Sequence, residues 1–577
     1  MEHLKQATRG ALHRRSAFGF DAPLLFLWGG LAVGLMIAIS SPASAATYYV
    51  DGDDPLASDA NPGTPTEPWR TLTYAATMAV AGDTVWIGGA VYNEQLATAH
   101  SGNLVDGPIH FAALPSETPV LDGTDVGWSV GLRIQHDCLT FVGLEIRGWT
   151  TGVWMTAAND VLLRDCEVHD VWYGIGAADG MHNFTLERVE VHHFTLYGFD
   201  ASPSGGADCY NGTLIGCRAH TCNDPEQNVD GFALGHGEQY GFHFVRCETY
   251  GVYDGFDISA RDTRLEACIA HDCTYRGLTG WRGGLEAVNC LLYDNGIMNV
   301  DLVRGGDEAQ RYTLTHCTLM GAEVYNIYVD STGAGIELEL HNCILAGGDN
   351  VGLWLEQLDG LLYTGDANVF HNDNAARMIW AGGEREFSLA EIEAGEWHDF
   401  SGQDAATEVA HSAGDLFRDP AGGDFHLPAG SPALDVGSPD WGVAADLEGR
   451  PRPLGDGFDC GAFEAPVPGA VGDRPDAGGE ETVDSAAARP GERMLAITPT
   501  LVRDAALLTY RLARPGSVAW RCFDAGGRLV AEQLVGEQLA GVHQLRWRSV
   551  AAASGVHFLE LRVDGRPWGR AAVRVVR

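Results

Sequence analysis

The sequence predicts an all-β fold in which short strands wind into a solenoid of stacked coils. Three observations support this: a recurring cysteine position, short apolar runs that begin at a glycine, and a high glycine content. The chain has 577 residues, of which 74 are glycine, as expected where every coil contains several tight turns. A repeat of about 20–30 residues built from short strands is typical of solenoids, whose coils bury their inner faces only by stacking.

The recurring position follows a short alternating run such as Val-Leu-Leu-Arg-Asp at 161–165. Seven cysteines occupy it, at intervals of 51, 30, 21, 22, 27 and 26 residues: Cys166, Cys217, Cys247, Cys268, Cys290, Cys317 and Cys343. Val189 fills the one double-length interval. Because free cysteine packs as a small hydrophobic side chain, we expect a buried row of thiols. Cys222 and Cys273, each five residues after a row cysteine, are the better disulfide candidates.

The N-terminal segment is typical of an exported protein. Lys5 and several arginines precede an apolar run over 23–39, and the small residues Ala43-Ser44-Ala45 follow. This pattern predicts a signal peptide over residues 1–45 and a secreted or cell-surface protein. An uncleaved membrane anchor is the alternative, because the run is nearly long enough to cross a bilayer. Lys5 is the only lysine, so cleavage would leave a protein without lysine.

Residues 46–125 are expected to form the first coils and their cap. Segments 61–64, 68–72 and 82–85 read Asn-Pro-Gly-Thr, Pro-Trp-Arg-Thr-Leu and Gly-Asp-Thr-Val, with a short helical pattern over 74–80. A terminal helix would cover the open hydrophobic face of the first coil. These segments resemble the N-terminal cap of right-handed parallel β-helix proteins. The resemblance implies that fold for the coils that follow.

Residues 126–465 are expected to be that right-handed parallel β-helix. Alternating polarity buries one side of each strand and exposes the other. A glycine followed by an apolar residue opens a strand in successive coils: Gly152-Val153, Gly174-Ile175, Gly198-Phe199, Gly231-Phe232, Gly255-Phe256 and Gly277-Leu278. Residues 361–465 are less regular, and their tail resembles the C-terminal end of many exported β-helix proteins.

Two further segments complete the chain. Residues 466–491 are rich in Pro, Gly, Ala, Asp and Glu, which predicts a flexible linker. Residues 492–577 contain alternating runs at 507–512, 518–524 and 556–563, which predict a small β-sandwich.

The sandwich carries a second resemblance. Its motif consists of Phe523-Asp524, Gly527-Arg528 and, later in the chain, Gly541 and His543. This motif resembles the Ig-like domain of flagellar hook-capping proteins and type IX secretion sorting tails. The usual opening motif Pro-Asn-Pro-Phe is replaced by Ile-Thr-Pro-Thr at 497–500. The expected role is therefore either surface anchoring or a passive spacer.

The charge of the chain restricts its partners. There are 78 acidic and 37 basic residues, for a net charge of −41. Binding to nucleic acid needs a basic surface, so a nucleic-acid partner is excluded. A strongly acidic protein is instead suited to bind cations.

Aligning the coils on their glycine steps predicts an acidic cluster. Asp230 and Asp254 directly precede the glycine in consecutive coils, Asp257 follows it by two residues, and Arg276 precedes the next glycine. Equivalent positions in adjacent coils lie about 4.8 Å apart. Each carboxylate pair would repel by about 1 kcal/mol in water and about 3 kcal/mol in a protein-like dielectric. A hard cation such as calcium, held by clustered oxygens, would relieve this repulsion. Asp-Gly pairs also form turns, but that does not explain Asp257.

The same residues carry a family resemblance. Asn-Val-Asp-Gly-Phe-Ala at 228–233 and Val-Tyr-Asp-Gly-Phe-Asp at 252–257 resemble polysaccharide lyase family 9. The resemblance implies calcium bound by Asp230, Asp254 and Asp257, with Tyr253 in place of the family's fourth aspartate. It also implies β-elimination on an acidic polysaccharide such as pectate.

The family's catalytic lysine is missing. The matching position is Thr279, and the cationic substitutes within reach are Arg276 and Arg282. Arginine resists deprotonation, although other β-helix pectate lyases are thought to use it as the base. The resemblance therefore leaves Arg276 and Arg282 as the candidate catalytic residues.

Two alternatives remain open. A non-catalytic surface or adhesion protein would hold glycans along the solenoid without turnover. A β-helix glycoside hydrolase would use a pair of carboxyl groups, such as Asp230 and Asp254, without calcium. In each case we expect a monomer that contacts a membrane only during secretion or through surface anchoring.

A row of rings is also predicted. Three residues after the cysteine or its equivalent stand His169, His192, His220, Tyr250, His271 and Tyr293. The row is either a set of metal ligands or a stack of rings at a turn, and we expect the stack.

Overall fold

The computed structural model describes residues 45–466 and 494–575, except 128, 203–206, 236–238, 304–308, 331–334, 348–350, 374–376, 384, 499–500, 503–504, 513–515, 525–527, 539–540, 549–554 and 564–565. The predicted signal peptide, apart from Ala45, and the predicted linker, apart from residue 466, lie outside the described residues.

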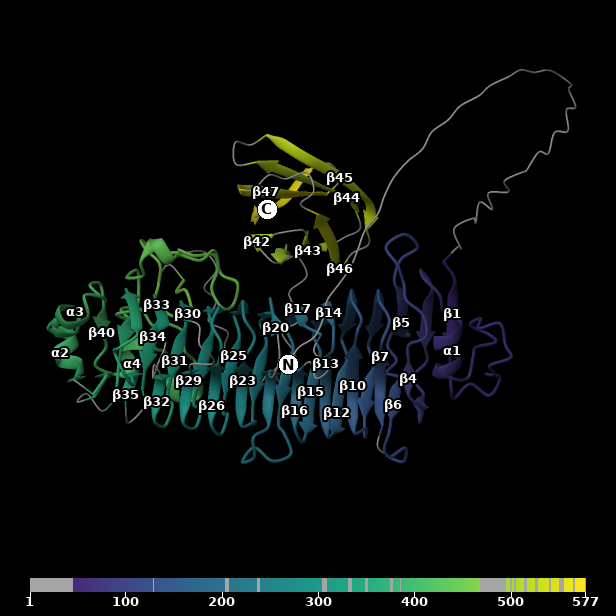
Figure 1. Cartoon of the computed structure of the whole chain (residues 1–577), viewed down its shortest axis with the longest axis horizontal. Coiled ribbons are helices and arrows are strands. Elements are labelled where there is room, and N and C mark those ends of the chain that lie inside the picture. Colours follow the sequence, from purple (N-terminus) through teal and green to yellow (C-terminus); the bar gives the residue numbers. More distant parts are fainter. Residues whose placement is uncertain are drawn as a thin grey trace, which may run out of the picture. The chain divides into compact units, whose positions relative to one another are not determined.

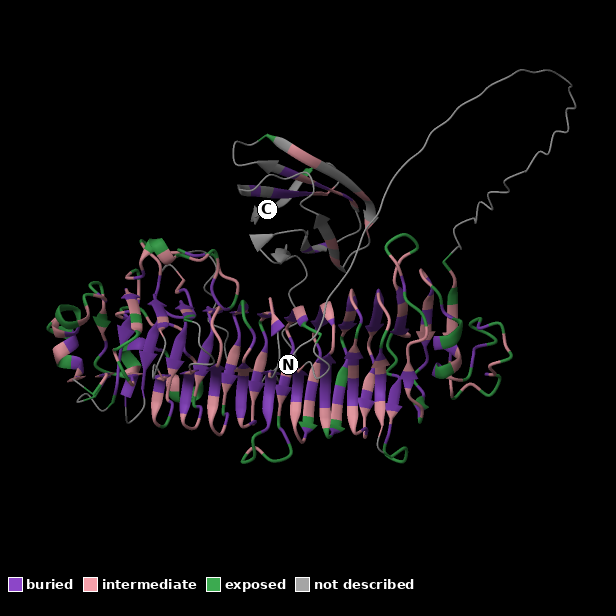
Figure 2. Cartoon of the chain, viewed as in Figure 1, coloured by how far each residue is buried: buried purple, intermediate pink, exposed green. Residues whose placement is uncertain are grey.

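The chain winds into a right-handed parallel β-helix with three long sheets, as the sequence predicts (Figure 1). Most coils contribute one strand to each sheet, and neighbouring strands within a sheet pair in parallel with one exception. Figure 2 shows buried residues along the strands and exposed residues mainly in the turns and loops. The all-β fold class is therefore confirmed.

The first sheet has fourteen strands. They are β1 (Thr47–Val50), β2 (Thr84–Ile87), β5 (Ile109–Ala113), β8 (Leu139–Val142), β11 (Val161–Arg164), β14 (His182–Glu187), β17 (Cys209–Ile215), β20 (Gln239–Tyr240), β21 (His243–Val245), β24 (Thr263–Glu266), β27 (Leu285–Val288), β30 (Gln310–Thr315), β33 (Ile336–His341) and β36 (Leu361–Asp366).

The second sheet has thirteen strands, and all of them pair in parallel except the last two. They are β4 (Leu96–Ala97), β7 (Val130–Ile134), β10 (Thr151–Thr156), β13 (Tyr173–Ala178), β16 (Tyr197–Ala201), β19 (Asp230–Leu234), β23 (Asp254–Ile258), β26 (Arg276–Gly280), β29 (Met298–Val303), β32 (Tyr325–Asp330), β35 (Val351–Leu355), β38 (Ile379–Ala381) and β39 (Arg385–Phe387).

The third sheet also has thirteen strands. They are β3 (Val91–Tyr92), β6 (Val120–Asp122), β9 (Glu145–Arg147), β12 (Glu167–Val171), β15 (Glu190–Phe194), β18 (Arg218–His220), β22 (Glu248–Tyr250), β25 (Ile269–His271), β28 (Leu291–Tyr293), β31 (Thr318–Met320), β34 (Ile344–Ala346), β37 (Val369–Phe370) and β40 (Glu408–Val409).

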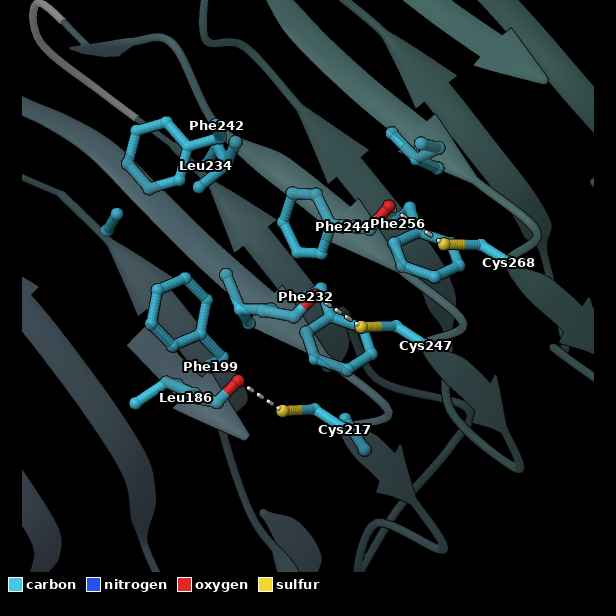
Figure 3. Close-up of a cluster of buried hydrophobic side chains, with 14 of the residues drawn as sticks. Leu186, Phe199, Cys217, Phe232, Leu234, Phe242, Phe244, Cys247, Phe256 and Cys268 are labelled. Carbon is cyan, nitrogen blue, oxygen red and sulfur yellow. Dashed lines mark hydrogen bonds between the residues drawn. The ribbon is translucent and has the colours of Figure 1, made fainter. Parts of the chain in front are cut away.

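The row cysteines stack inside the helix as free thiols, as predicted. Each Sγ lies near a backbone carbonyl of the preceding coil, at 3.3 Å for Cys217 and Leu186 O and at 3.4 Å for Cys247 and Leu214 O (Figure 3). Phenylalanines stack beside them, with the Phe232 and Phe256 rings 5.1 Å apart. The interior is thus a continuous apolar column that holds successive coils in register.

The disulfide suggested for Cys222 and Cys273 is wrong, because both residues are free thiols. Cys222 N–H donates to Gly251 O, and Gly251 N–H donates to Asp272 O, one coil further on. The two cysteines are therefore two coil steps apart, about 9.6 Å at the usual strand spacing. A disulfide needs Cα atoms closer than about 7 Å.

The first coil is capped by the helix α1 (Leu72–Met78), which begins two residues earlier than the sequence pattern suggests. The Thr71 hydroxyl accepts a hydrogen bond from Tyr74 N–H and so fixes the N-terminus of the helix. Leu72 and Ala75 are buried and cover the end of the core.

Short helices follow the last coils. They are α2 (Leu389–Glu393), α3 (Glu396–Ser401), α4 (Ala413–Leu416), η1 (Pro420–Gly422) and η2 (Pro439–Trp441). Among the described residues, none of the helices is long and apolar enough to cross a membrane.

The C-terminal unit consists of two further sheets. Their strands are β41 (Met494–Thr498), β43 (Ala505–Leu512) and β46 (Gly541–Arg548) in one, and β42 (Leu501–Val502), β44 (Gly516–Asp524), β45 (Leu529–Gln538), β47 (Gly555–Val563) and β48 (Arg566–Val575) in the other. Side chains of both sheets, including Tyr510, Trp520 and Leu559, share one hydrophobic core. The unit is a small sandwich, and its likeness to Ig-like domains stays a prediction.

Candidate functional site

The winding of the second sheet brings the predicted acidic residues to neighbouring strands. Asp230 on β19 pairs in register with Asp254 on β23, which pairs with Arg276 on β26. Asp257 on β23 pairs with Ala233 on one side and with Thr279 on the other. The alignment of coils on their glycine steps therefore gives the correct register for these positions.

A local irregularity places Asp254 and Asp257 on the same face. Residues three apart in a regular strand point to opposite sides of the sheet. Here Gly255 and Phe256 both turn inward: a Cβ on Gly255 would lie 3.1 Å from Cys273 Sγ, and Phe256 stacks on Phe232 in the core. Two consecutive inward positions leave Asp254 and Asp257 on the outer face. The glycine is required because the core has no room for a side chain at that step.

The carboxyl groups of this cluster are buried and interact strongly. Asp230 and Asp254 are each 2% exposed. Burial raises the pKa of Asp230 well above its ordinary value, and the charges of Asp257 and Asp254 raise it further. Burial also raises the pKa of Asp254 to about 7, although Arg276 opposes the shift. The cluster therefore holds more negative charge than its surroundings can solvate.

Arg276 joins this cluster to a carboxylate of the next coil. Its Nη1 lies 3.2 Å from Asp254 Oδ2, and its Nε lies 2.6 Å from Asp301 Oδ2. The guanidinium carbon also lies 4.1 Å from the centroid of the Tyr275 ring. Burial lowers the pKa of Arg276, but the two carboxylates outweigh it and raise that pKa overall. The geometry favours a permanent cation at this position over a proton acceptor.

Two further aspartates, Asp200 and Asp301, lie on the same face and were not predicted as site residues. Asp200 on β16 accepts hydrogen bonds from Tyr173 Oη and Ser202 Oγ. Asp301 on β29 pairs in register with Thr279, and burial raises its pKa to about 6 against the effect of Arg276. Asp200 occupies the same position in the aligned coils as Asp257, and this shared position could have identified Asp200 from the sequence. No such signal marks Asp301, because Asn299 stands where the coils that precede it have glycine.

The remaining predicted residues lie around the cluster. Thr279 is fully buried at the register position next to Asp257. Arg282 lies in the turn after β26, six residues beyond Arg276. Tyr253, which replaces the fourth aspartate of the family pattern, stacks on Tyr275 with the ring centroids 4.9 Å apart.

The donor set suits a hard cation. Among the described residues, Asp230 Oδ1 and Asp254 Oδ1 are buried and have no hydrogen-bond partner. Oxygen ligands of this kind are those that calcium prefers. As the side chains are placed, no three His, Cys, Asp or Glu groups in the described parts of the chain converge closely enough to hold an ion. Binding would therefore require the carboxylates to turn toward one another.

The predicted row of rings forms a stack on the third sheet. The centroids of neighbouring rings lie 4.6 to 5.4 Å apart from His169 to Tyr293. Carboxylates of preceding coils contact the imidazoles, with Glu167 at 2.9 Å from His192 and Glu190 at 2.9 Å from His220. The row is thus a ring stack lined by acidic residues.

Comparison with known proteins relates part of the β-helix to a described family. Residues 48–307 match the family described as "Pel9A-like, right handed beta helix region". An uncharacterized protein of Bacillus subtilis (strain 168), YwoF, is 36% identical over 105 residues, which cover 17% of this chain and 22% of that relative. The chain thus spans about a fifth of the length of this curated relative.

Solved structures with a similar fold include pectate lyase Pel9A, at 14% identity and a TM-score of 0.42, covering 73% of this chain and 97% of that one. A rhamnogalacturonan lyase matches at 15% identity and a TM-score of 0.33, covering 65% of this chain and 90% of that one. Residues 48–307 of this chain are thus similar to the Pel9A-like right-handed β-helix region.

Proposed function

We propose that the outer face of the second sheet is the active site of a calcium-dependent lyase that cleaves an acidic polysaccharide. The observation that carries the proposal is the register of Asp230 with Asp254, which brings Asp257 to the same face. Their buried oxygens supply hard ligands, and the family match over residues 48–307 supports a lyase-like site.

The residues take separate roles in this proposal. Asp230, Asp254 and Asp257 hold the cation, and calcium, when bound, would supply the charge that holds the substrate carboxylate and acidifies the neighbouring C5–H. Arg276 stays protonated and adds a fixed positive charge beside that carboxylate. Arg282 is then the arginine left to accept the C5 proton, which it does as a neutral guanidine that has first released a proton to solvent. The electron pair of the broken C5–H bond forms the C4=C5 double bond as the C4–O bond breaks, and the leaving oxygen takes a proton from water.

The rest of the chain fits an exported enzyme. We propose that the N-terminal segment directs secretion, and that the C-terminal sandwich is a spacer or surface anchor. The protein then acts as a monomer on polysaccharide outside the cell. The strongly acidic composition is compatible with this location.

A second candidate function is glycoside hydrolysis. Asp230 and Asp254 are two buried carboxyl groups on adjacent strands, and hydrolases of this type need one acid and one base or nucleophile. In that case Arg276 would keep Asp254 ionised through its ion pair, and calcium would be unnecessary.

The test is an assay on polygalacturonate with chelator-treated protein and added calcium. A lyase gives an ultraviolet-absorbing unsaturated product that requires calcium and is lost in Asp254→Asn, while the exposed Asp125→Asn variant keeps wild-type activity. New reducing ends without the unsaturated product, unaffected by chelator, would establish the hydrolase instead.

A thermal melt provides a second readout. Calcium at one hundred times its Kd should stabilise the protein by about 2.7 kcal/mol, and this shift should disappear in Asp230→Asn. The absence of both activity and a calcium-dependent shift in melting temperature would rule out the lyase.

A further inference from the structure

Ala46, the residue before β1, lies against a buried carboxylate. Asp83, which directly precedes β2, is 2% exposed. Its Oδ1 accepts a hydrogen bond from Ala46 N–H at 2.8 Å, and its Oδ2 accepts one from Val80 N–H at 2.9 Å. The same side chain therefore holds the nitrogen of Ala46 and closes the turn before β2.

The backbone fixes Ala46 as well. Thr84 N–H donates to Ala46 O at 2.9 Å, and β1 and β2 pair in register from Thr47 and Thr84 onward. Ala46 is half-buried, whereas Ala45 is exposed. The nitrogen of Ala46 therefore cannot leave Asp83 without disturbing the pairing of β1.

Asp83 has no cationic partner among the described residues. Both of its hydrogen-bond donors are uncharged backbone groups. Its charge acts on β1, where burial raises the pKa of Tyr48 and the charge of Asp83 adds to the shift. Lys5 is the only lysine, so the β-helix holds no lysine that could pair with this carboxylate. A buried charge is costly unless it is paired, so a cation at this position would stabilise the first two coils.

Cleavage after Ala45 would supply that cation. When an export protease hydrolyses the bond between Ala45 and Ala46, the hydroxyl of water joins the Ala45 carbonyl carbon and the remaining hydrogen joins the Ala46 nitrogen. The new amine takes a further proton from solvent, because the pKa of an α-amino group is ordinarily about 7.7–8.0. The nitrogen that lies 2.8 Å from Asp83 Oδ1 thereby changes from an amide into an ammonium group.

We propose that Asp83 is the acceptor for a new N-terminus at Ala46, and that processing after Ala45 creates an ion pair that fastens β1 to the second coil. Charge-assisted hydrogen bonds are stronger than those between neutral groups, and a buried pair is little screened by salt. Chain ends fray unless they are tied down, and β1 is the end strand of the first sheet. The inference rests on the proposed export of the chain and not on the reaction at the carboxylate cluster.

Processing itself is tested by mass spectrometry of the protein that a bacterial host exports. We expect the mature chain to begin at Ala46. Its α-amino group is then the only primary amine, because no lysine follows Lys5. An amine-reactive ester such as N-hydroxysuccinimidyl acetate therefore modifies that group alone. A mature N-terminus at any other residue would overturn the assignment.

The rate of acetylation at about pH 8 tests the ion pair. Because the pair keeps the amine protonated and shielded, the native protein should react about tenfold more slowly than Asp83→Asn. The control is Asp106→Asn, which removes an exposed carboxylate in the turn packed against Gly82; it should react at the wild-type rate. Melting temperatures show whether each variant is folded. Equal rates for the wild type and Asp83→Asn would refute the pair.

A chain with one extra residue separates charge from hydrogen bonding. Protein that begins at Ala45 keeps an uncharged amide at Ala46 and carries its ammonium one residue, about 3.8 Å, away. Hydrogen exchange of the β1 amides should be about tenfold slower in the protein that begins at Ala46, and Asp83→Asn should abolish the difference. Equal exchange in the two chains would show that Asp83 acts only as a turn residue, against the proposal. None of these measurements involves calcium or polysaccharide, so such a failure leaves the proposed lyase standing.

Discussion

Arg276 shows how one side chain depends on three coils at once. It lies on β26 and pairs with Asp254 of the preceding coil and Asp301 of the following one. The side chain is 17% exposed, and those of its two partners are 3% and 4% exposed. Its charge therefore offsets two buried carboxylates that would otherwise oppose the stacking of these coils.

Replacing this arginine should be costly. We expect Arg276→Gln to lower the free energy of unfolding by about 3 kcal/mol, because removing one partner leaves buried charge uncompensated. Urea denaturation followed by circular dichroism measures the loss. Arg377→Gln, which removes the solvent-exposed pair with Glu386, should leave the midpoint unchanged. Equal midpoints for the two variants would contradict the structural role of Arg276.

The ring stack of the third sheet illustrates how whole strands are held in register. Histidines and tyrosines at one position of successive strands pack face to face, and the Tyr250 ring lies between His220 and His271. Glutamates of preceding coils contact the imidazoles, as Glu248 contacts His271. Stacking and ion pairing thus act between the same strands, but only ion pairing depends on pH.

His271 makes this dependence measurable. Burial lowers its pKa, but hydrogen bonds to Glu248 and Asp272 outweigh burial and raise that pKa overall. The folded-state pKa then exceeds the unfolded value of about 6.5. The stabilisation that protonated His271 gives the folded protein is therefore complete below about pH 6.5 and is lost as the pH rises through the folded-state pKa. We expect His271→Gln to lower the melting temperature more at pH 5.5 than at pH 9. Tyr250→Phe keeps a ring without an imidazole and should show no such difference; a pH-independent loss in His271→Gln would refute the ion pairing.

Across the full chain, net charge acts on every element. The sequence carries 78 acidic and 37 basic residues, so long-range repulsion opposes the compact state. Ion pairs such as those of Arg276 counter this repulsion only locally. Added salt screens both effects, but the excess of acidic residues makes the repulsion the larger one.

Salt should therefore stabilise the protein. We expect the melting temperature to rise when sodium chloride is increased from about 0.01 M to 0.15 M, which shortens the screening length from about 30 Å to 8 Å. Calorimetry measures the shift. Choline chloride at the same ionic strength should give the same rise, because screening depends on ionic strength and not on which cation is added. A fall in melting temperature would show that attractive pairs dominate, and the sodium series also serves as the ionic-strength control for calcium.

Much of the fold was determined by local pattern. One position in each coil is marked by a cysteine, as at Cys217, Cys247 and Cys268, and another by a glycine, as at Gly231 and Gly255. At both positions the core leaves room for only a small group. These markers predicted the thiol row, the ring stack and the register of Asp230 with Asp254. The markers were reliable because each coil repeats the same turn geometry. Residues with the same local role therefore occupy the same position in every coil.

Other features were decided only by the assembled coils. Asp301 follows Asn299 and not glycine, so nothing local ties it to Arg276; pairing of β26 with β29 does. The spacing of Cys222 and Cys273 suggested a disulfide, yet an intervening coil separates them. Coils differ in length because their loops differ, so positions without a marker acquire their neighbours only when the strands pair.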